Sequence, residues 1–153
     1  ETFTMNPPTL SRILFALVLA ATGVLHAQTS TVTVHDAWVR EPMGSRNMTG
    51  AFAIVENTGA TPRAIVAASA DISDKVELHE MKNEGGMMRM SPVPRIDVPA
   101  HGRLELKPGS FHVMLFDLKR KPAPGDTVRL TLTLDDGTTV SAEATVRRPG
   151  ESR

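Results

Sequence analysis

The sequence of 153 residues contains no cysteine. This absence excludes disulfide bonds, so a hydrophobic core has to supply the stability of the fold. It also excludes a thiol nucleophile, a lipid anchor on a cysteine and zinc sites that use cysteine ligands. A blue-copper centre is excluded as well, because its copper requires a thiolate. We therefore expect any metal ligands of this chain to be other side chains.

An excess of charge of either sign is missing too. The chain has 17 Lys and Arg against 17 Asp and Glu, which gives a formal net charge of zero at pH 7. A basic excess is what draws proteins to nucleic acids and to anionic membranes. The composition therefore gives no reason to expect nucleic acid or a charged membrane surface as a partner.

One mostly apolar run stands near the start of the sequence. Arg12 precedes the run Ile13–Leu25, and Ala27 then offers a small residue for cleavage. This order is typical of a secretory signal peptide, and the run is shorter than the roughly 20 residues that a membrane-spanning helix needs. We predict a cleavable signal peptide over residues 5–27, export to the periplasm, and a single β domain over residues 28–153 that is not held in the membrane.

Long helical periodicity is absent after this leader. The chain instead shows short segments rich in β-branched and aromatic residues and bounded by Gly, Pro or Asn, a pattern typical of strands. These segments are TVTVHDAWVR, GAFAIVENTG, KVELHEM, RIDVPAHGRLELKPG, SFHVMLFDL, DTVRLTLTL and TTVSAEATVRR. The Asp136-Gly137 pair predicts a hairpin turn, and residues 64–71 (AIVAASAD) could hold one helical turn at most. The pattern predicts an all-β sandwich or barrel of Greek-key type.

Methionine is concentrated beside a histidine. Of the eight Met residues, four lie between Met81 and Met90, just after His79. A two-residue loop at Glu84-Gly85 would place His79 opposite Met90 and Met81 opposite Met88, all on one face of a hairpin. A second His-x-Met pair, His112 and Met114, lies on another predicted strand and also shares one face.

The chemistry of these side chains indicates copper. Thioethers are soft neutral ligands that select Cu(I), and imidazole also binds copper. Zinc favours Cys, His or carboxylate ligands, and calcium favours oxygen. Methionine is also a frequent core residue because it is flexible and polarisable, so periodicity alone leaves a purely structural interpretation open.

A family resemblance decides between these interpretations. His79, ten residues, Met90, twenty-one residues, His112, one residue and Met114 reproduce the signature of the periplasmic copper chaperones called PCuAC. The segments DAWVR, GAFAIVENTG, KVELHEM, GMMRM, LKPGSFHVMLFDL and GDTVRLTLTL also resemble that family. The resemblance runs from about His35 to Val146.

The resemblance implies a cupredoxin-like Greek-key β-barrel that binds one Cu(I) at an exposed site. Its ligands would be His79, Met90, His112 and Met114, with Met81 as an auxiliary residue. It also implies delivery of copper to the CuA centre of cytochrome c oxidase subunit II, alone or with a thioredoxin-like assembly factor. We expect the chain to be a monomer. We add Met88 as a further candidate from the hairpin argument above.

The remaining candidates receive plainer interpretations. His35 opens the first strand and His101 lies in a turn, so both are expected at the surface. Trp38 is expected in the core. Met43 and Met48 flank a predicted loop; a solvated loop is favoured, and an outer copper-handling pair is the alternative.

Three other functions have to be considered. The same site could sequester copper for resistance without a dedicated acceptor. The Met-rich surface could dock a partner without metal. An enzyme is not expected, since no nucleophile elbow or other recognisable catalytic arrangement appears.

Overall fold

The computed structural model describes residues 2 and 30–151, so the predicted signal peptide lies outside the described residues. The described residues form ten strands and no helix. The strands are β1 (Val32–Arg40), β2 (Met48–Asn57), β3 (Arg63–Ala70), β4 (Ser73–Glu84), β5 (Met87–Pro92), β6 (Ile96–Val98), β7 (Gly102–Leu106), β8 (His112–Leu118), β9 (Thr127–Leu134) and β10 (Thr139–Arg147). Accordingly, this part of the chain offers no helix of a length and apolarity suited to crossing a membrane.

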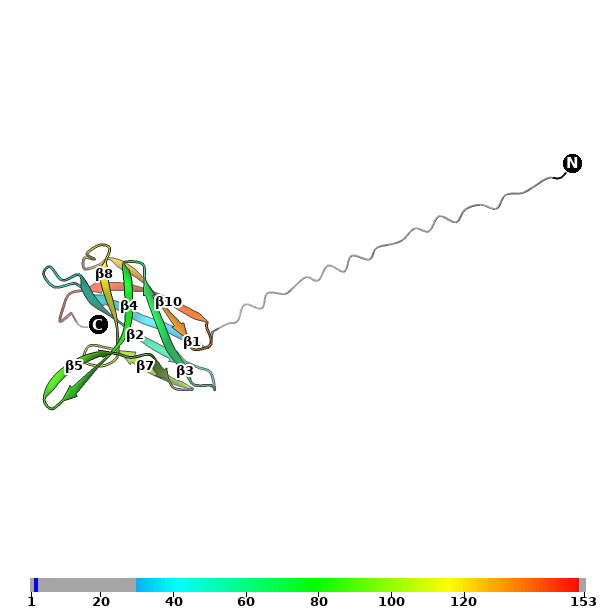
Figure 1. Cartoon of the computed structure of the whole chain (residues 1–153), viewed down its shortest axis with the longest axis horizontal. Helices are drawn as coiled ribbons and strands as arrows, with labels where there is room; N and C mark the ends of the chain where they lie inside the picture. The colour runs from blue at the N-terminus through cyan, green and yellow to red at the C-terminus, as the bar shows by residue number, and fades with distance from the viewer. Residues whose placement is uncertain (1, 3–29, 152–153) are drawn as a thin grey trace.

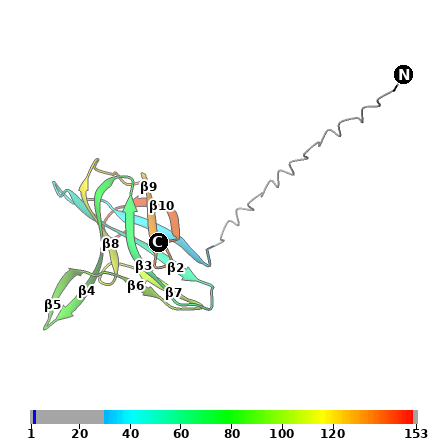
Figure 2. The same ribbon diagram turned by 45° about the vertical axis from the view of Figure 1, so that its right-hand side comes forward.

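Seven of the strands close into a barrel. The order around it is β4, β8, β2, β1, β10, β9 and β3, and β3 returns to pair with β4. The β1–β10 pair is parallel, and the other neighbours in the ring are antiparallel. Strands β5, β6 and β7 pair with β4, β3 and β2 outside the ring. Figure 1 labels β5 and β7, and Figure 2 also labels β6. The predicted all-β class and Greek-key barrel are confirmed, because strands distant in sequence such as β2, β8 and β4 are neighbours.

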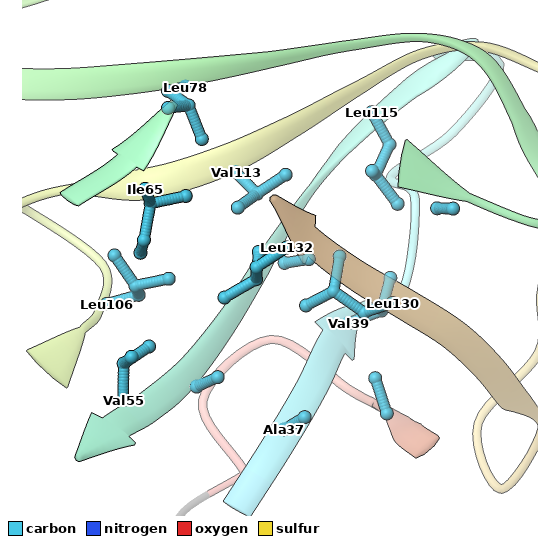
Figure 3. Close-up of a cluster of buried hydrophobic side chains, with 14 of the residues drawn as sticks. Ala37, Val39, Val55, Ile65, Leu78, Leu106, Val113, Leu115, Leu130 and Leu132 are labelled. Atoms are coloured by element: carbon cyan, nitrogen blue, oxygen red, sulfur yellow. The ribbon is translucent and has the colours of Figure 1, made fainter. Parts of the chain in front are cut away.

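The interior of the barrel is filled by alternate side chains. In β9, Val128, Leu130, Leu132 and Leu134 are buried, while the intervening threonines and Arg129 lie toward solvent. Figure 3 shows side chains from several strands meeting in this core. Period-two alternation of this kind buries one face of each strand, and burial of apolar surface contributes roughly 25 cal/mol per Å².

The hairpin predicted at Asp136-Gly137 is confirmed. Strands β9 and β10 pair from Thr133 opposite Thr139 onward, and the amide of Gly137 donates to the carbonyl of Leu134. Gly137 has φ of 82°, a conformation that glycine adopts without steric cost.

A strand over residues 64–71 was not predicted, and the one helical turn allowed for these residues is not formed. Residues Arg63–Ala70 form β3, which pairs with β9 and, at Ala70, with Ser73 of β4. Alanine-rich segments have low strand propensity, but pairing with neighbouring strands overrides it. The register shifts between Ile65 and Ala67, which marks an irregularity that also masked the alternation. This strand is what closes the barrel.

The hairpin of β4 and β5 projects from the barrel (Figure 1, Figure 2). Its two-residue turn is Gly85-Gly86, between the paired residues Glu84 and Met87, one residue later than predicted. The φ angles of the two glycines are 61° and 86°. A hairpin turn with both central residues at positive φ selects glycine at both positions, which disfavours Glu84 there.

The register predicted for this hairpin was therefore wrong by two residues. Met81 lies opposite Met90 and not Met88, and His79 lies opposite Pro92. Because side chains alternate with a period of two, a shift of two residues leaves each one on its predicted face. The face shared by His79, Met81 and Met90 is therefore the predicted one, although the direct partners differ.

Candidate metal centre

Strand β8 separates the core from the candidate site. Val113 and Leu115 point into the core cluster, whereas His112 and Met114 alternate with them and lie on the other face. These two side chains are nevertheless only 4% and 7% exposed. A thioether and an imidazole are thus buried on the outer face of the barrel, away from the hydrophobic core.

His79 reaches the same face from the neighbouring strand. In the β4–β8 ladder His79 lies directly opposite His112. The centroids of the two imidazole rings are 5.8 Å apart, and His79 is buried as well. Two histidines that are 33 positions apart in the sequence are thereby brought together by strand pairing.

The projecting hairpin adds sulfur to this pair of rings. Met90 Sδ lies 3.1 Å from His112 Nε2, and Met81 is the cross-strand partner of Met90. Met90, Met81, Met114 and His112 all line one cleft of about 270 Å³. His79 stands beside His112 but does not form part of the wall of the cleft.

The protonation of His112 follows from its hydrogen bond. His112 Nδ1 lies 2.9 Å from the carbonyl oxygen of Ser110, which can only accept, so Nδ1 carries the proton and donates it. Burial lowers the pKa of His112 below its ordinary value of 6.5, which favours the neutral ring. In that ring Nε2 bears a lone pair, and it faces the sulfur of Met90. Both groups are potential ligands for the same ion.

His79 is held by a carboxylate. Its Nε2 lies 2.8 Å from Glu77 Oε2, so Nε2–H donates to the carboxylate. The hydrogen bond with His79 is the main reason why the pKa of Glu77 is lowered. The other nitrogen of His79, Nδ1, is buried and has no hydrogen-bond partner among the described residues. A buried acceptor without a partner costs about 1–3 kcal/mol, and a bound metal ion would remove that cost.

Glu77 and the Ser110 carbonyl fit the role of outer groups that orient metal-binding imidazoles. Metal-bound histidines commonly donate their second N–H to a carboxylate or a backbone carbonyl, which fixes the tautomer. Here each histidine has one such partner and one nitrogen left as a lone pair. Neither Glu77 nor Ser110 was singled out from the sequence; for Glu77 the signal was its position two residues before His79 on the same strand face.

A row of rings borders the site on the barrel wall. Phe52 of β2 lies 6.2 Å from His112, centroid to centroid, and Trp38 of β1 lies 4.4 Å from Phe52. The expectation that Trp38 belongs to the core was wrong. It pairs with Phe52 on the site face and is only partly buried, because the core face of β1 is taken by Ala37 and Val39.

Phe52 lines the cleft, and the neighbouring Gly50 leaves room for its ring. Gly50 lies opposite Met114 in the β2–β8 ladder. A Cβ at Gly50 would approach the Phe52 ring to 2.9 Å, closer than such atoms pack. Glycine at this position therefore leaves the space that the Phe52 ring occupies.

The structure thus brings together five of the six residues proposed from the sequence. His79, Met81, Met90, His112 and Met114 cluster on one face of β4, β5 and β8. Met88 lies two positions nearer the hairpin tip, opposite Asn83, and is exposed outside the cleft. As predicted, His35 and His101 are exposed.

The chemistry of the cluster favours a soft metal. No group of three or more His, Cys, Asp or Glu side chains in residues 2 and 30–151 is arranged to hold a metal ion. The neighbouring donors are two imidazole nitrogens and thioether sulfurs, a set suited to Cu(I). The unpartnered Nδ1 of His79 and the lone pair of His112 directed at Met90 fit such an ion.

Comparisons with known proteins identify the family of the chain. The LpqE-like lipoprotein family matches residues 32–146. Lxx21020 of Leifsonia xyli subsp. xyli, which is named as a lipoprotein, is 34% identical over 113 residues, which is 73% of this chain and 67% of its own length. The uncharacterized protein RP573 of Rickettsia prowazekii is 31% identical over 86 residues, 54% of this chain and 46% of its own.

Solved structures extend the comparison to PCuAC domains. The Cu(I) form of DR1885 from Deinococcus radiodurans is 36% identical, with a TM-score of 0.66 over 83% of this chain and 85% of that one. The apo PCuAC domain of PmoF1 is 22% identical, with a TM-score of 0.66 over 78% of this chain and 96% of that one, which shows the fold alone. The expected cupredoxin-like barrel is confirmed. The chain therefore belongs to the LpqE-like family, the family of the PCuAC domains.

Proposed function

We propose that this protein is an exported Cu(I) chaperone. It binds one cuprous ion through His79, Met90, His112 and Met114, with Met81 beside them. The observation that carries the proposal is the 3.1 Å approach of His112 Nε2 to Met90 Sδ while His112 Nδ1 donates to a backbone carbonyl. Two lone-pair donors that face each other in a cleft are well placed to share a cation.

The oxidation state follows from the donors. Thioethers are neutral and polarisable and favour Cu(I) over harder divalent ions. The relative from Deinococcus radiodurans was solved in a Cu(I) form, and the PCuAC domain of PmoF2 in a copper-bound form. These names support a cuprous ion as the cargo of this chain.

Release of the ion requires ligand exchange and no catalytic residue. Met90 is the most exposed of the four proposed ligands, since it lies on the projecting hairpin while the other three are buried. A thiolate of an acceptor can replace this thioether first, giving an ion shared between the two proteins. Thiolates are soft, charged ligands, so they bind Cu(I) more strongly than neutral thioethers do and draw the ion toward the acceptor.

We propose the CuA centre of cytochrome c oxidase subunit II as the destination, reached directly or through a thioredoxin-like assembly factor. Both offer cysteine thiolates, which bind Cu(I) more strongly than the thioethers of this chain do. The periplasm is the compartment that we propose for the handover. The chain itself would act as a binding protein and not as an enzyme.

The binding step is tested by anaerobic titration with Cu(I) in the presence of a competing chelator. The expected result is one tightly bound equivalent in the wild type and a fall of at least about 100-fold in affinity for His112→Ala, which removes a ligand and not only its outer partner. Met88→Leu is the matched control, because Met88 is an exposed thioether outside the cleft. Equal affinities for all three proteins would exclude this site.

The delivery step is tested separately. The Cu(I)-loaded protein is mixed with the reduced soluble domain of subunit II, and copper is measured on each after separation. Transfer to wild-type acceptor, and none to an acceptor whose cysteines are replaced by serine, is the expected result. Tight binding without any transfer would favour the alternative of a copper-sequestering protein. Absence of copper binding altogether would favour a metal-free interaction domain.

A further inference from the structure

Two methionines outside the proposed ligand set line the same cleft. Met43 lies in the loop between β1 and β2, and Met48 is the first residue of β2. Both belong to the wall of the cleft that holds His112 and Met114. They are 51% and 43% exposed, so they do not serve as core residues. The cleft therefore has exposed thioethers at Met43 and Met48 as well as the buried thioether of Met114. We call the exposed part of the cleft that carries Met43 and Met48 its mouth.

The sheet register places Met48 close to the inner ligands. In the β2–β8 ladder Gly50 is opposite Met114, and Met48 is opposite Phe116. Met48 and Met114 are thus diagonal neighbours on one face, at a typical separation of roughly 7–8 Å that long side chains can span. Met48 is therefore the thioether that β2 presents on the face of Met114.

Hydrogen bonds hold the loop that carries Met43 over the cleft. The amide of Arg46 donates to the carbonyl of Met43, which closes a turn, and Gly44 within it has φ of 60°. Lys121 Nζ donates to the carbonyl oxygen of Gly44 over 2.6 Å. The amide of Leu118 donates to the carbonyl oxygen of Asn47. The loop is tied to the end of β8, so Met43 is kept beside the cleft.

The charges in the wall of the cleft disfavour divalent ions more than monovalent ones. The charged residues in the wall of the cleft are Arg40, Glu41 and Arg46, whose formal charges sum to +1. The Coulomb energy between a fixed charge and an ion scales with the charge of the ion. A dication is therefore repelled about twice as strongly as a monocation at the same distance. A neutral thioether pair in this surrounding selects a soft monovalent ion.

We propose that Met43 and Met48 form a second soft-metal site at the mouth of the cleft, which binds one further Cu(I) more weakly than the histidine-containing site. The inference rests on the proposed function, because the first ion occupies the inner site. The outer site has no imidazole and only neutral sulfur donors, which explains its lower affinity. It lies where an ion enters or leaves the inner ligands.

The experiment is a titration with Ag(I), a redox-inert soft monovalent ion, monitored through the methyl signals of 13C-methyl methionine in the purified chain. The first equivalent should shift Met90 and Met114, and the second should shift Met43 and Met48. The variant Met43→Leu/Met48→Leu should keep the first event with its affinity changed less than about twofold and lose the second, since Leu replaces Met with little change of volume.

The control is Met87→Leu/Met88→Leu, which removes two exposed thioethers at the hairpin tip, outside the cleft. It should bind both equivalents as the wild type does. A second equivalent that leaves Met43 and Met48 unshifted, or that persists in Met43→Leu/Met48→Leu, would overturn the second site. Absence of the first event would instead contradict the proposed function, so the two failures are distinguishable.

Discussion

Over residues 112–115 the two faces of β8 are buried to a similar extent but are chemically opposite. Val113 and Leu115 have no exposed surface and pack in the apolar core, while His112 and Met114, one position away, are nearly as inaccessible. The two core side chains, Val113 and Leu115, are aliphatic groups that gain from removal of water. On the other face the buried groups keep lone pairs, and the Nδ1 of nearby His79 has no partner among the described residues.

The difference shows that burial serves two purposes in one strand. On the core face it contributes stability. On the site face it holds nitrogen and sulfur donors in place and limits their contact with water, at a cost in unsatisfied polar groups. Substitutions on the two faces should therefore separate folding stability from copper affinity.

The largest effect is expected from Leu115→Ala on the core face. Loss of a fully buried leucine side chain leaves a cavity and should lower the free energy of unfolding by about 2–5 kcal/mol. Chemical denaturation of the metal-free protein measures this. The affinity of the folded protein for Cu(I) should stay within about twofold of the wild type. A large loss of affinity in the folded state would show that the two faces are not independent.

The converse is expected from Met114→Leu on the site face. The substitution keeps the volume and hydrophobicity of the side chain, so the free energy of unfolding should change by less than about 1.5 kcal/mol. The affinity for Cu(I) should fall by about 100-fold or more, because a sulfur donor is lost at the ligand itself rather than at an outer partner. Competition with a Cu(I) chelator measures the affinity. Unchanged affinity would mean that Met114 only packs.

A smaller effect is expected from Glu77→Gln. The amide keeps the shape of Glu77 but removes the charge that holds the Nε2–H of His79. Replacement of such outer partners lowers metal affinity by about 10–100-fold. Glu80→Gln, on the same strand but the opposite face, is the matched control and should leave the affinity unchanged. Equal effects of the two substitutions would point to a general loss of negative charge.

The smallest expected effect is that of pH on the free energy of unfolding of the metal-free protein. The pKa of His112 is lowered by burial. Below the ordinary value of 6.5, this imidazole is therefore protonated in the unfolded chain while it is still neutral in the folded chain. Above about pH 6.5, His112 therefore adds no pH dependence to the free energy of unfolding. Stability is lost as the pH falls from there toward the lowered pKa of His112. Denaturation at several pH values should show a weaker loss for His112→Gln. An equal loss in His112→Gln and in the wild type would contradict this effect of the burial of His112.

The fold class could be predicted because apolar and polar residues alternate within each single strand. In β9 the sequence TVRLTLTL assigns each residue to a face without knowledge of its neighbours. Strand β3 could not be recognised in this way, because an alanine-rich segment becomes a strand only when β9 and β4 lie beside it. Closure of the barrel depends on that strand.

The candidate site was predictable in its members and not in its geometry. The spacing of His79, Met90, His112 and Met114 carried the family signature. The hairpin register depended on which of three adjacent turn residues take positive φ, and this choice shifted the pairing by two residues. Glu77 and the Ser110 carbonyl escaped notice because their roles come from side-chain and backbone directions around the two histidines.

The central claim is tested most directly by X-ray absorption spectroscopy of the protein loaded anaerobically with one equivalent of Cu(I). The account predicts a cuprous edge with two nitrogen and two sulfur neighbours. Met90→Leu should lose one sulfur and His112→Ala one nitrogen, while Met88→Leu should give the wild-type spectrum. A first shell of nitrogen and oxygen alone, or a spectrum that none of these substitutions changes, would contradict it.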